Sequence, residues 1–177
     1  MSSKTVARIP TYPLEHPYFS EIAHMVELPV TDPDAGIQFF PAIDGFETGS
    51  VGSEKIDISY LYVPYHRDSL CSFDKHPHNE ELFVVLQGSF HMIAGLSKHG
   101  EFPRIEELRC FYVKEGDIFI QKRNVWHTAC WPVNPEIPVR YLMVLSGHRS
   151  LNEEEVKVDH YIRELPDNYA VIPDFPE

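Results

Sequence analysis

Short β-rich runs separated by turn residues limit what this chain can fold into more than any other feature of its sequence. Gly, Pro, Asn and Asp gather between the runs, and the runs themselves are rich in apolar and β-branched side chains. Runs of this kind, joined by links of hairpin length, are typical of a closed or sandwich-like antiparallel barrel. We therefore predict an all-β fold, an antiparallel β-barrel or jelly roll with a few short helices. The expected strands are residues 37–41, 55–63, 69–73, 81–87, 89–94, 108–113, 117–121, 125–130 and 139–146.

The chain has 177 residues and a hydrophobic content of 43%, which suits a single domain with one sizeable core. Residues 1–35 are rich in proline and short of periodicity, and we interpret them as an N-terminal arm with one short helix at 20–26. Residues 36–148 are the expected barrel. Residues 149–177 are the expected C-terminal tail, with a second short helix at 152–158.

Composition excludes several classes of partner. The formal net charge of -12 argues against a nucleic-acid partner and against an anionic membrane surface. No run approaches the length of a membrane span, and the N-terminus leads into no apolar segment of the signal-peptide kind. Cys71, Cys110 and Cys130 form no CxxC pair, which is typical of reduced thiols. We therefore expect a cytoplasmic protein that acts on small molecules.

The first chemically distinctive segment is residues 74–81, which read DKHPHNEE. Side chains two apart on a strand share a face, so His76 and His78 point the same way if the segment is extended, as Pro77 favours. We expect Glu81 on the inward face of the strand that follows. A carboxylate there must be paired or metal-bound, because burying an isolated charge is costly. The alternative is that the acidic end of the segment is a solvated loop.

The second segment is residues 116–127, which read GDIFIQKRNVWH. Asn124 is expected in a tight turn, because Asn tolerates the left-handed conformation. His127 then lies on the returning strand and faces the first segment across the barrel, although a buried core histidine is the simpler alternative. Cys130, three residues further on, is expected on the opposite face. Together the two segments predict a one-metal site with open coordination positions, or an acid/base pocket.

The first segment resembles the first motif of the cupin superfamily, which reads Gly, five residues, His-x-His, three or four residues, Glu, six residues, Gly. Six residues separate Glu81 from Gly88, as that motif requires. His76 takes the place of the second histidine, and Asp74 stands in place of the first. The resemblance implies a cupin-type barrel, also called a double-stranded β-helix.

The second segment resembles the second cupin motif, which reads Gly, five residues, Pro-x-Gly, two residues, His, three residues, Asn. Gly116 and His127 keep its spacing, whereas Lys122, Asn124 and Trp131 replace the usual Pro, Gly and Asn. The two motifs and their flanking strands cover about residues 56–146.

Within the cupins, the chain is most similar to the ureidoglycolate lyase family. The similar pieces are His76-Pro77 followed by an aromatic residue and a glycine, residues 108–111 (LRCF) and residues 123–127 (RNVWH), of which the last is the most specific. There are two departures. Thr128 replaces the second histidine of the family's Trp-His-His-Pro run, and Glu81 replaces its glutamine. The change to Glu81 favours a metal site.

This resemblance implies a lyase that cleaves a carbon–nitrogen bond. It would release urea from a small ureido hydroxy acid and leave glyoxylate, in purine and allantoin catabolism. The substrate is then a small carboxylate, and Arg123 or Arg140 would neutralise its charge. Two alternatives stay open: another metal-dependent cupin enzyme, such as a dioxygenase or a sugar isomerase, and a cupin that binds a small ligand without catalysis.

The expected catalytic residues are His76, His78 and His127, because imidazole titrates near neutral pH. The expected metal ligands are His76, Glu81 and His127, with His78 as a fourth ligand or a proton donor. This set of nitrogen and oxygen donors suits one divalent transition metal, Zn, Mn, Ni or Fe. Since many cupins pair through edge strands and N-terminal arms, the resemblance also implies a homodimer.

Overall fold

The structure of the chain is a computed structural model that describes residues 5–26, 56–96, 101–146 and 161–174. The strand expected at 37–41 and the helix expected at 152–158 lie outside these residues. Within them, no helix is long and apolar enough to span a bilayer. The elements are β1 (Thr5–Pro13), α1 (Pro17–Ile22), β2 (Ala23–Met25), β3 (Ile56–Val63), β4 (Ser72–Lys75), β5 (Glu81–Gln87), β6 (Phe90–Leu96), the 3-10 helix η2 (Ile105–Glu107), β7 (Arg109–Val113), β8 (Ile118–Gln121), β9 (Val125–His127), β10 (Trp131–Pro132), β11 (Val139–Ser146), β12 (Tyr161–Glu164) and β13 (Tyr169–Asp174).

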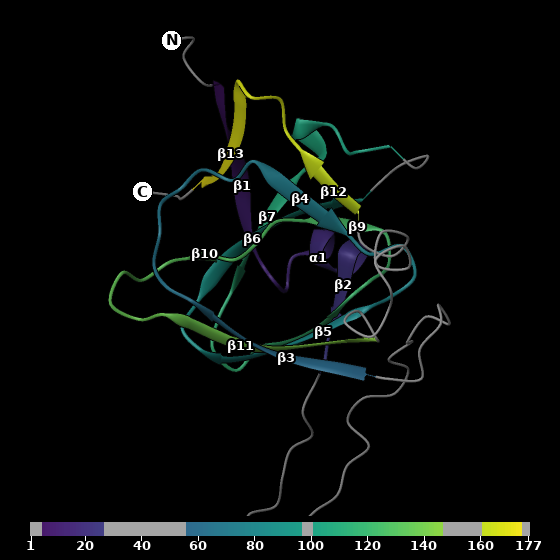
Figure 1. Ribbon diagram of the computed structural model, residues 1–177, viewed down its shortest axis with the longest axis vertical. Helices are drawn as coiled ribbons and strands as arrows, with labels where there is room; N and C mark the ends of the chain where they lie inside the picture. The colour runs from purple at the N-terminus through teal and green to yellow at the C-terminus, as the bar shows by residue number, and fades with distance from the viewer. Residues whose placement is uncertain (1–4, 27–55, 97–100, 147–160, 175–177) are drawn as a thin grey trace, which may run out of the picture.

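The described strands form two sheets that face each other around a common interior (Figure 1). The larger sheet has the strand order β12-β4-β9-β6-β7-β1-β13, with β10 paired to β6, and the smaller has the order β2-β8-β5-β11-β3. Most neighbours are antiparallel, whereas β1 pairs in parallel with β13 and β7. The predicted all-β, cupin-type antiparallel barrel is therefore confirmed.

Aromatic side chains from both sheets fill the interior. Phe83 of β5 stacks on Phe119 of β8, with ring centroids 4.7 Å apart. Phe19 of α1 meets Phe111 of β7 edge-on at 5.3 Å and Phe119 at 5.6 Å. Such ring pairs add to the free energy that the burial of their apolar area supplies. Helix α1 thus covers one end of the barrel core rather than lying on its outer surface.

The predicted strands at 81–87 and 139–146 match β5 and β11 residue for residue. The strand predicted at 125–130 is wrong in its second half, because β9 ends at His127 and the chain resumes as β10. Thr128 explains the break. Its N–H donates to the Ile93 carbonyl at 2.9 Å, and its hydroxyl accepts from the Ile93 N–H at 3.2 Å. The side-chain oxygen thus takes the place of a backbone acceptor.

The N-terminal residues contribute more regular structure than the sequence indicates. The helix expected at 20–26 is instead α1 at Pro17–Ile22, with His16 as N-cap and proline in its first turn, a position that needs no N–H. Residues 23–25 form β2 and pair with β8. Strand β1 was not predicted from the sequence. Its partners β13 and β7 are distant in sequence, and the pattern of neighbouring residues contains no information about them.

Gly88 makes the turn between β5 and β6, with φ of +76°. A Cβ atom at this position would lie 2.7 Å from the Pro138 carbonyl oxygen, on top of the cost of a left-handed conformation. Gly116 has a similar φ of +86°, but a Cβ there would meet nothing within 4 Å. An alanine at Gly116 would carry only the cost of the left-handed conformation, whereas an alanine at Gly88 would also clash with Pro138.

We expect Gly88→Ala to lower the free energy of unfolding by roughly 3 kcal/mol, and Gly116→Ala by only about 1 kcal/mol. The difference reflects the contact with Pro138, because both variants carry the same cost in φ. Urea unfolding followed by circular dichroism measures both values. Equal losses in the two variants would show that the backbone around Pro138 moves aside.

Candidate metal centre

Three buried side chains from separate parts of the chain converge between the sheets. They are His76, just after β4, Glu81, the first residue of β5, and His127, the last residue of β9. Nε2 of His76 lies 3.4 Å from Oε1 of Glu81, and Nε2 of His127 lies 3.3 Å from Oε2. The three residues are 7%, 2% and 8% exposed, and their ligand atoms lie within 4.8 Å of one another. We call this group the triad.

A left-handed turn in the second histidine segment is hydrogen-bonded to the first segment. Asn124 has φ of +64°, as the sequence predicts, and its N–H donates to the His76 carbonyl at 2.9 Å. Two residues earlier in the first segment, Asp74 of β4 pairs in register with His127 of β9. The backbone contacts therefore bring the two imidazoles to the same side of the barrel before any ligand binds.

Gln121 is a site residue that the sequence analysis missed. It ends β8 directly opposite Glu81 in the β5–β8 pairing and is buried. Its Nε2 donates to Oε2 of Glu81 at 2.8 Å and lies 3.0 Å from Nδ1 of His127. A signal was present, because Gln121 is two residues from the inward-facing Phe119 on the same strand. A polar residue in phase with core residues calls for a buried partner.

Burial determines the charge state of the imidazole at His127. Its pKa is lowered, first by loss of solvent and then by the neighbouring His76, while the carboxylates of Glu81 and Asp74 oppose the shift. Burial has the largest effect, so the ring stays neutral near pH 7. A neutral imidazole has a lone pair available for a metal ion or for a proton.

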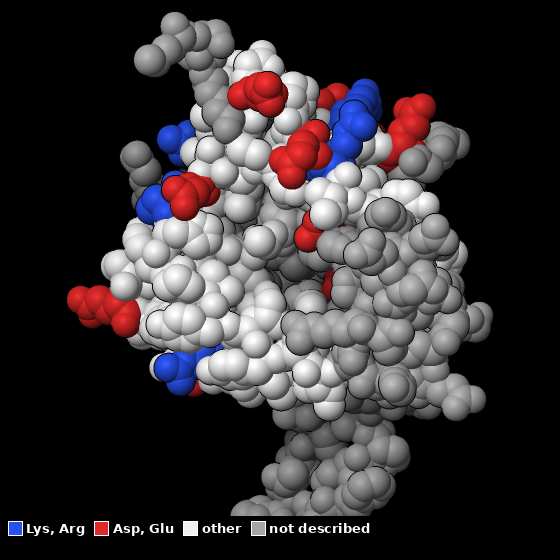
Figure 2. All heavy atoms as spheres, viewed as in Figure 1, with Lys and Arg blue, Asp and Glu red and all other residues white. Residues whose placement is uncertain are grey.

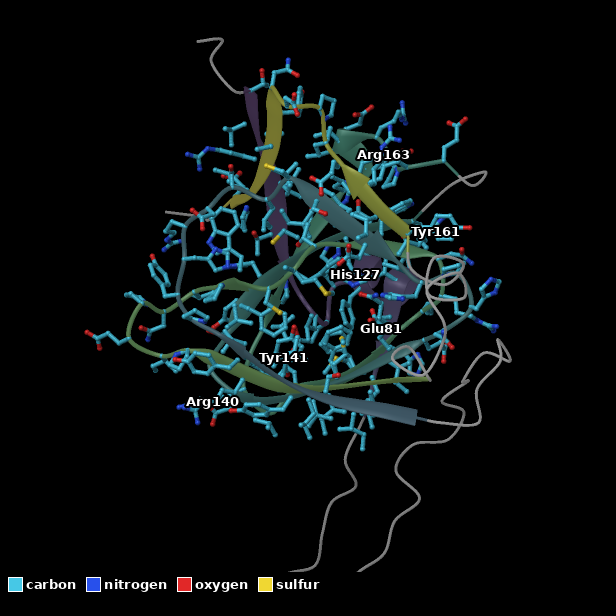
Figure 3. The ribbon with its side chains drawn as sticks, viewed as in Figure 1. Glu81, His127, Arg140, Tyr141, Tyr161 and Arg163 are labelled. Carbon is cyan, nitrogen blue, oxygen red and sulfur yellow. The ribbon has the colours of Figure 1, made fainter. Side chains whose placement is uncertain are left out.

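The triad lies at the wall of a cavity of about 210 Å³. Viewed as in Figure 1, the described surface is hollowed near its centre and acidic side chains line the hollow (Figure 2). In Figure 3, Glu81, His127 and Tyr141 all lie in the interior between the sheets. Asp74 also lines the cavity, and apolar side chains make up most of the remaining wall. The cavity thus combines the polar triad with a largely apolar wall.

Cys130 corrects one expectation. The sequence analysis placed it on the face opposite His127, but both residues line the cavity. Alternation does not apply, because β9 ends at His127 and the chain between the two residues is not a strand. The Cys130 thiol bonds with the hydroxyl of Tyr141, and burial raises its pKa to about 12. The thiol is therefore neutral at physiological pH and is a poor nucleophile.

The remaining expected site residues do not join the triad. β4 ends at Lys75, so the segment with His78 is not extended, and His78 neither belongs to the cluster nor lines the cavity. Arg123 is exposed. Arg140 is exposed too, and its guanidinium lies over the Tyr62 ring on the outer side of the barrel (Figure 3). Neither arginine lines the cavity, so its geometry does not support the expected contacts with a substrate carboxylate.

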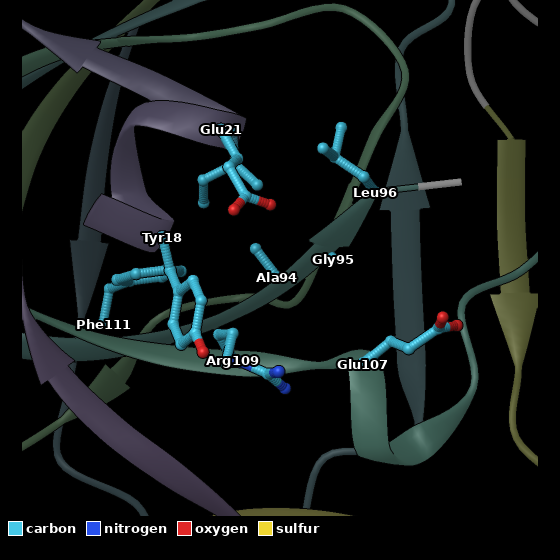
Figure 4. A pocket seen from close by; sticks show the side chains of 9 residues that line it. Tyr18, Glu21, Ala94, Gly95, Leu96, Glu107, Arg109 and Phe111 are labelled. Carbon is cyan, nitrogen blue, oxygen red and sulfur yellow. The ribbon is translucent and has the colours of Figure 1, made fainter. Parts of the chain in front are cut away.

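A second, smaller pocket of about 110 Å³ lies beside α1, β6 and β7 (Figure 4). Its cation, Arg109, is already engaged. The guanidinium donates to the carbonyls of Glu106 and Leu108 and stacks over the ring of Tyr18. With its cation held by the protein, this pocket is a weaker candidate for a functional site than the triad.

Comparison with protein-family models gives no match, and no curated protein matches the sequence. Among solved structures, the chain is similar to a dTDP-sugar isomerase from Desulfovibrio desulfuricans, with 13% identity and a TM-score of 0.51 over 82% of this chain and 85% of that chain. This similarity supports the cupin-type fold and no particular activity.

Two further solved structures show weaker similarity. Fe(II)-HppE is 16% identical with a TM-score of 0.37, over 50% of this chain and 42% of its own. Oxalate decarboxylase from Bacillus subtilis is 17% identical with a TM-score of 0.39, over 58% of this chain and 27% of its own. Their low TM-scores carry no argument about this chain. The similarity to the ureidoglycolate lyase family therefore stays a prediction from the sequence.

We expect Gln121→Leu to lower the free energy of unfolding of the metal-free protein by about 1–3 kcal/mol, because Glu81 loses a buried donor. The control is Gln87→Leu at the other end of β5, where the side chain is only half-buried. Urea unfolding measures both variants. A loss at Gln87 as large as that at Gln121 would contradict a supporting role for the Gln121 amide.

Proposed function

We propose that this chain is an enzyme that uses one divalent metal ion held by His76, Glu81 and His127. The convergence of two imidazoles and one carboxylate on a single buried point, with ligand atoms within 4.8 Å of one another, carries the proposal. Exposed acidic groups cluster often without function. These three groups are buried and come from both sheets, so the barrel itself holds them together.

The donor distances fit a metal ion. Bonds of about 2.1 Å at tetrahedral to octahedral angles separate neighbouring donor atoms by about 3.0–3.4 Å. The two imidazole–carboxylate distances are 3.4 Å to Oε1 and 3.3 Å to Oε2 of Glu81, so one ion at this point would bind the carboxylate through both oxygens. A buried carboxylate also needs a compensating positive charge, which an imidazole held neutral does not supply. A divalent cation would supply that charge.

Gln121 would support the carboxylate of the triad. Its Nε2 donates to Oε2 of Glu81 at 2.8 Å, and the same nitrogen lies 3.0 Å from Nδ1 of His127. Metal binding at Nε2 of His127 requires the ring proton on Nδ1, which then needs an acceptor. The Val125 carbonyl, 3.4 Å from Nδ1, can accept that proton.

The donor set favours oxygenase chemistry. Two histidines and one carboxylate with open positions are typical of non-haem iron enzymes that activate dioxygen. When bound, the metal would supply Lewis acidity and a coordination site for the substrate head group. The protein's own contribution is the apolar wall formed by Phe83, Met92 and Met143, which excludes water.

A ureidoglycolate lyase activity is the second candidate, and the run from Arg123 to His127 supports it. Such a substrate has a carboxylate, a hydroxyl and a ureido group, all of which need polar partners. The apolar side of the cavity supplies few, and Arg123 and Arg140 are exposed. The cytoplasmic location and a role in purine catabolism stay predictions from the sequence.

Metal content and glyoxylate release test the proposal together. We expect the purified protein to bind about one divalent metal ion per chain by elemental analysis after reconstitution, and Glu81→Gln to bind none. Glu80→Gln is the matched control, because Glu80 is next to Glu81 in the sequence and its carboxylate lies outside the triad. The metal-free Glu81→Gln protein should be as stable as the parent or more stable, since the buried charge is gone.

Two outcomes would contradict the proposal. Absence of metal from the parent protein after reconstitution with Fe, Mn, Ni and Zn would remove the metal role. Glyoxylate release from ureidoglycolate by the parent, lost in His127→Ala but kept in Glu81→Gln, would favour a metal-free lyase that uses imidazole as base.

We also propose that the protein is a homodimer that pairs through β3. Among the described strands, β3 ends its sheet and has a neighbour only on the β11 side. Its outer face carries Ile58, Tyr60 and Tyr62, which are 69%, 56% and 55% exposed. An antiparallel edge strand can pair with its own copy about a two-fold axis, and contiguous exposed apolar side chains mark interaction surfaces.

We expect light scattering at micromolar concentration to give twice the chain mass of 20.5 kDa. Ile58→Lys should shift the protein towards monomer, because the lysine would be buried between copies. Ile162→Lys is the matched control, a residue 60% exposed on β12. A monomeric parent would end the proposal, and dissociation by Ile162→Lys alone would place the interface at β12.

A further inference from the structure

Outside the triad, most of the cavity wall is built from apolar side chains of both sheets. Leu61 of β3, Phe83 of β5 and Met143 of β11 come from the smaller sheet, and Met92 of β6 comes from the larger. Phe83 is itself packed between the Phe119 and Tyr141 rings, so it is held in place. A ligand whose head group reaches the triad therefore lays the rest of its surface against hydrocarbon and thioether.

The charged groups on this wall are acidic. Asp74 and Glu81 both line the cavity, and the described part of the lining contains neither lysine nor arginine. One divalent metal ion would offset the charge of Glu81 and that of one anionic head group on the ligand. A second anionic group on the ligand would then meet Asp74 on one side and apolar side chains on the other, and both oppose it. A neutral tail encounters neither penalty.

Apart from Asp74, the groups of the wall that could ionise are neutral. Burial, followed by the neighbouring Cys130, raises the pKa of the Tyr141 hydroxyl above its ordinary value. Burial also raises the pKa of the Cys130 thiol to about 12. Both groups therefore stay protonated at physiological pH and offer no charge to an anionic group of a ligand.

The size of the cavity restricts the ligand further. Its volume of about 210 Å³ lies below the roughly 300 Å³ at which pockets for drug-sized ligands begin. The cavity therefore suits a small molecule.

We propose that the cavity takes a small ligand with one metal-binding head group and an uncharged, mainly apolar tail, and that it discriminates against a second anionic group. This inference rests on the metal-dependent function proposed above and adds the class of substrate to it. The tail lies against Leu61, Phe83 and Met143.

A pair of hydroxamates tests the proposal. Isovalerohydroxamate and malonomonohydroxamate share the same metal-binding head and the same number of non-hydrogen atoms, but the first ends in an isopropyl group and the second in a carboxylate. Each is titrated into the Co(II)-loaded protein, with the Co(II) absorption spectrum and isothermal calorimetry as readouts. We expect isovalerohydroxamate to bind at least tenfold more tightly.

Met143→Lys is the matched variant, because it places a cation on the apolar side of the cavity. We expect it to reverse the order of the two affinities while Co(II) binding is kept. Leu61→Lys, on a half-buried position of the neighbouring β3, serves the same purpose if Met143→Lys does not fold.

The outcomes separate this inference from the proposed function. If Co(II) binds and both hydroxamates change its spectrum with equal affinity, or if malonomonohydroxamate binds more tightly, the inference is wrong and the metal function stands. If neither Co(II) nor another divalent metal binds, both proposals are wrong. Tighter binding of isovalerohydroxamate with reversal in a lysine variant supports both.

Discussion

The buried Glu81 carboxylate is the interaction around which the centre of this barrel is arranged. It lies between two imidazoles, His76 and His127, and accepts a hydrogen bond from the Gln121 amide. An ionised carboxylate in an apolar interior is unfavourable unless several groups stabilise it together. The residues that surround Glu81 come from β8, from β9 and from the end of β4. The position of this one charge thus constrains four separate parts of the chain.

The two sheets contribute different residues to the site. His127 belongs to the larger sheet and His76 directly follows its strand β4, whereas the smaller sheet supplies Glu81 and Gln121 as direct neighbours on β5 and β8. Asn124 links the imidazole segments through the bond from its N–H to the His76 carbonyl. A change in how the sheets pack would therefore alter the triad distances, whereas a change within either sheet would leave its own pair of residues together. The aromatic packing of Phe83, Phe119 and Phe19 opposes such a shift.

Local patterns predicted a large part of this arrangement. The alternation through β5 placed Glu81 inward, and the left-handed turn at Asn124 followed from the residue type. Three other features did not follow from pattern. Strand β1 depends on partners far away in sequence. Cys130 reaches the cavity because Thr128 ends β9 early, and a rule of alternation assumes that the strand continues. His78 follows a bend that the sequence did not reveal.

The sequence by itself determined the all-β class, the bounds of β5 and β11 and the three residue types of the triad, because periodicity and turn chemistry act over a few neighbouring residues. Only the tertiary structure decided that Gln121 joins the triad, that Asp74 and Tyr141 line the same cavity, and that Arg123 and Arg140 stay outside it. These outcomes depend on how two sheets pack and twist against each other. That packing is a property of long-range contacts, and no short segment of the chain contains it.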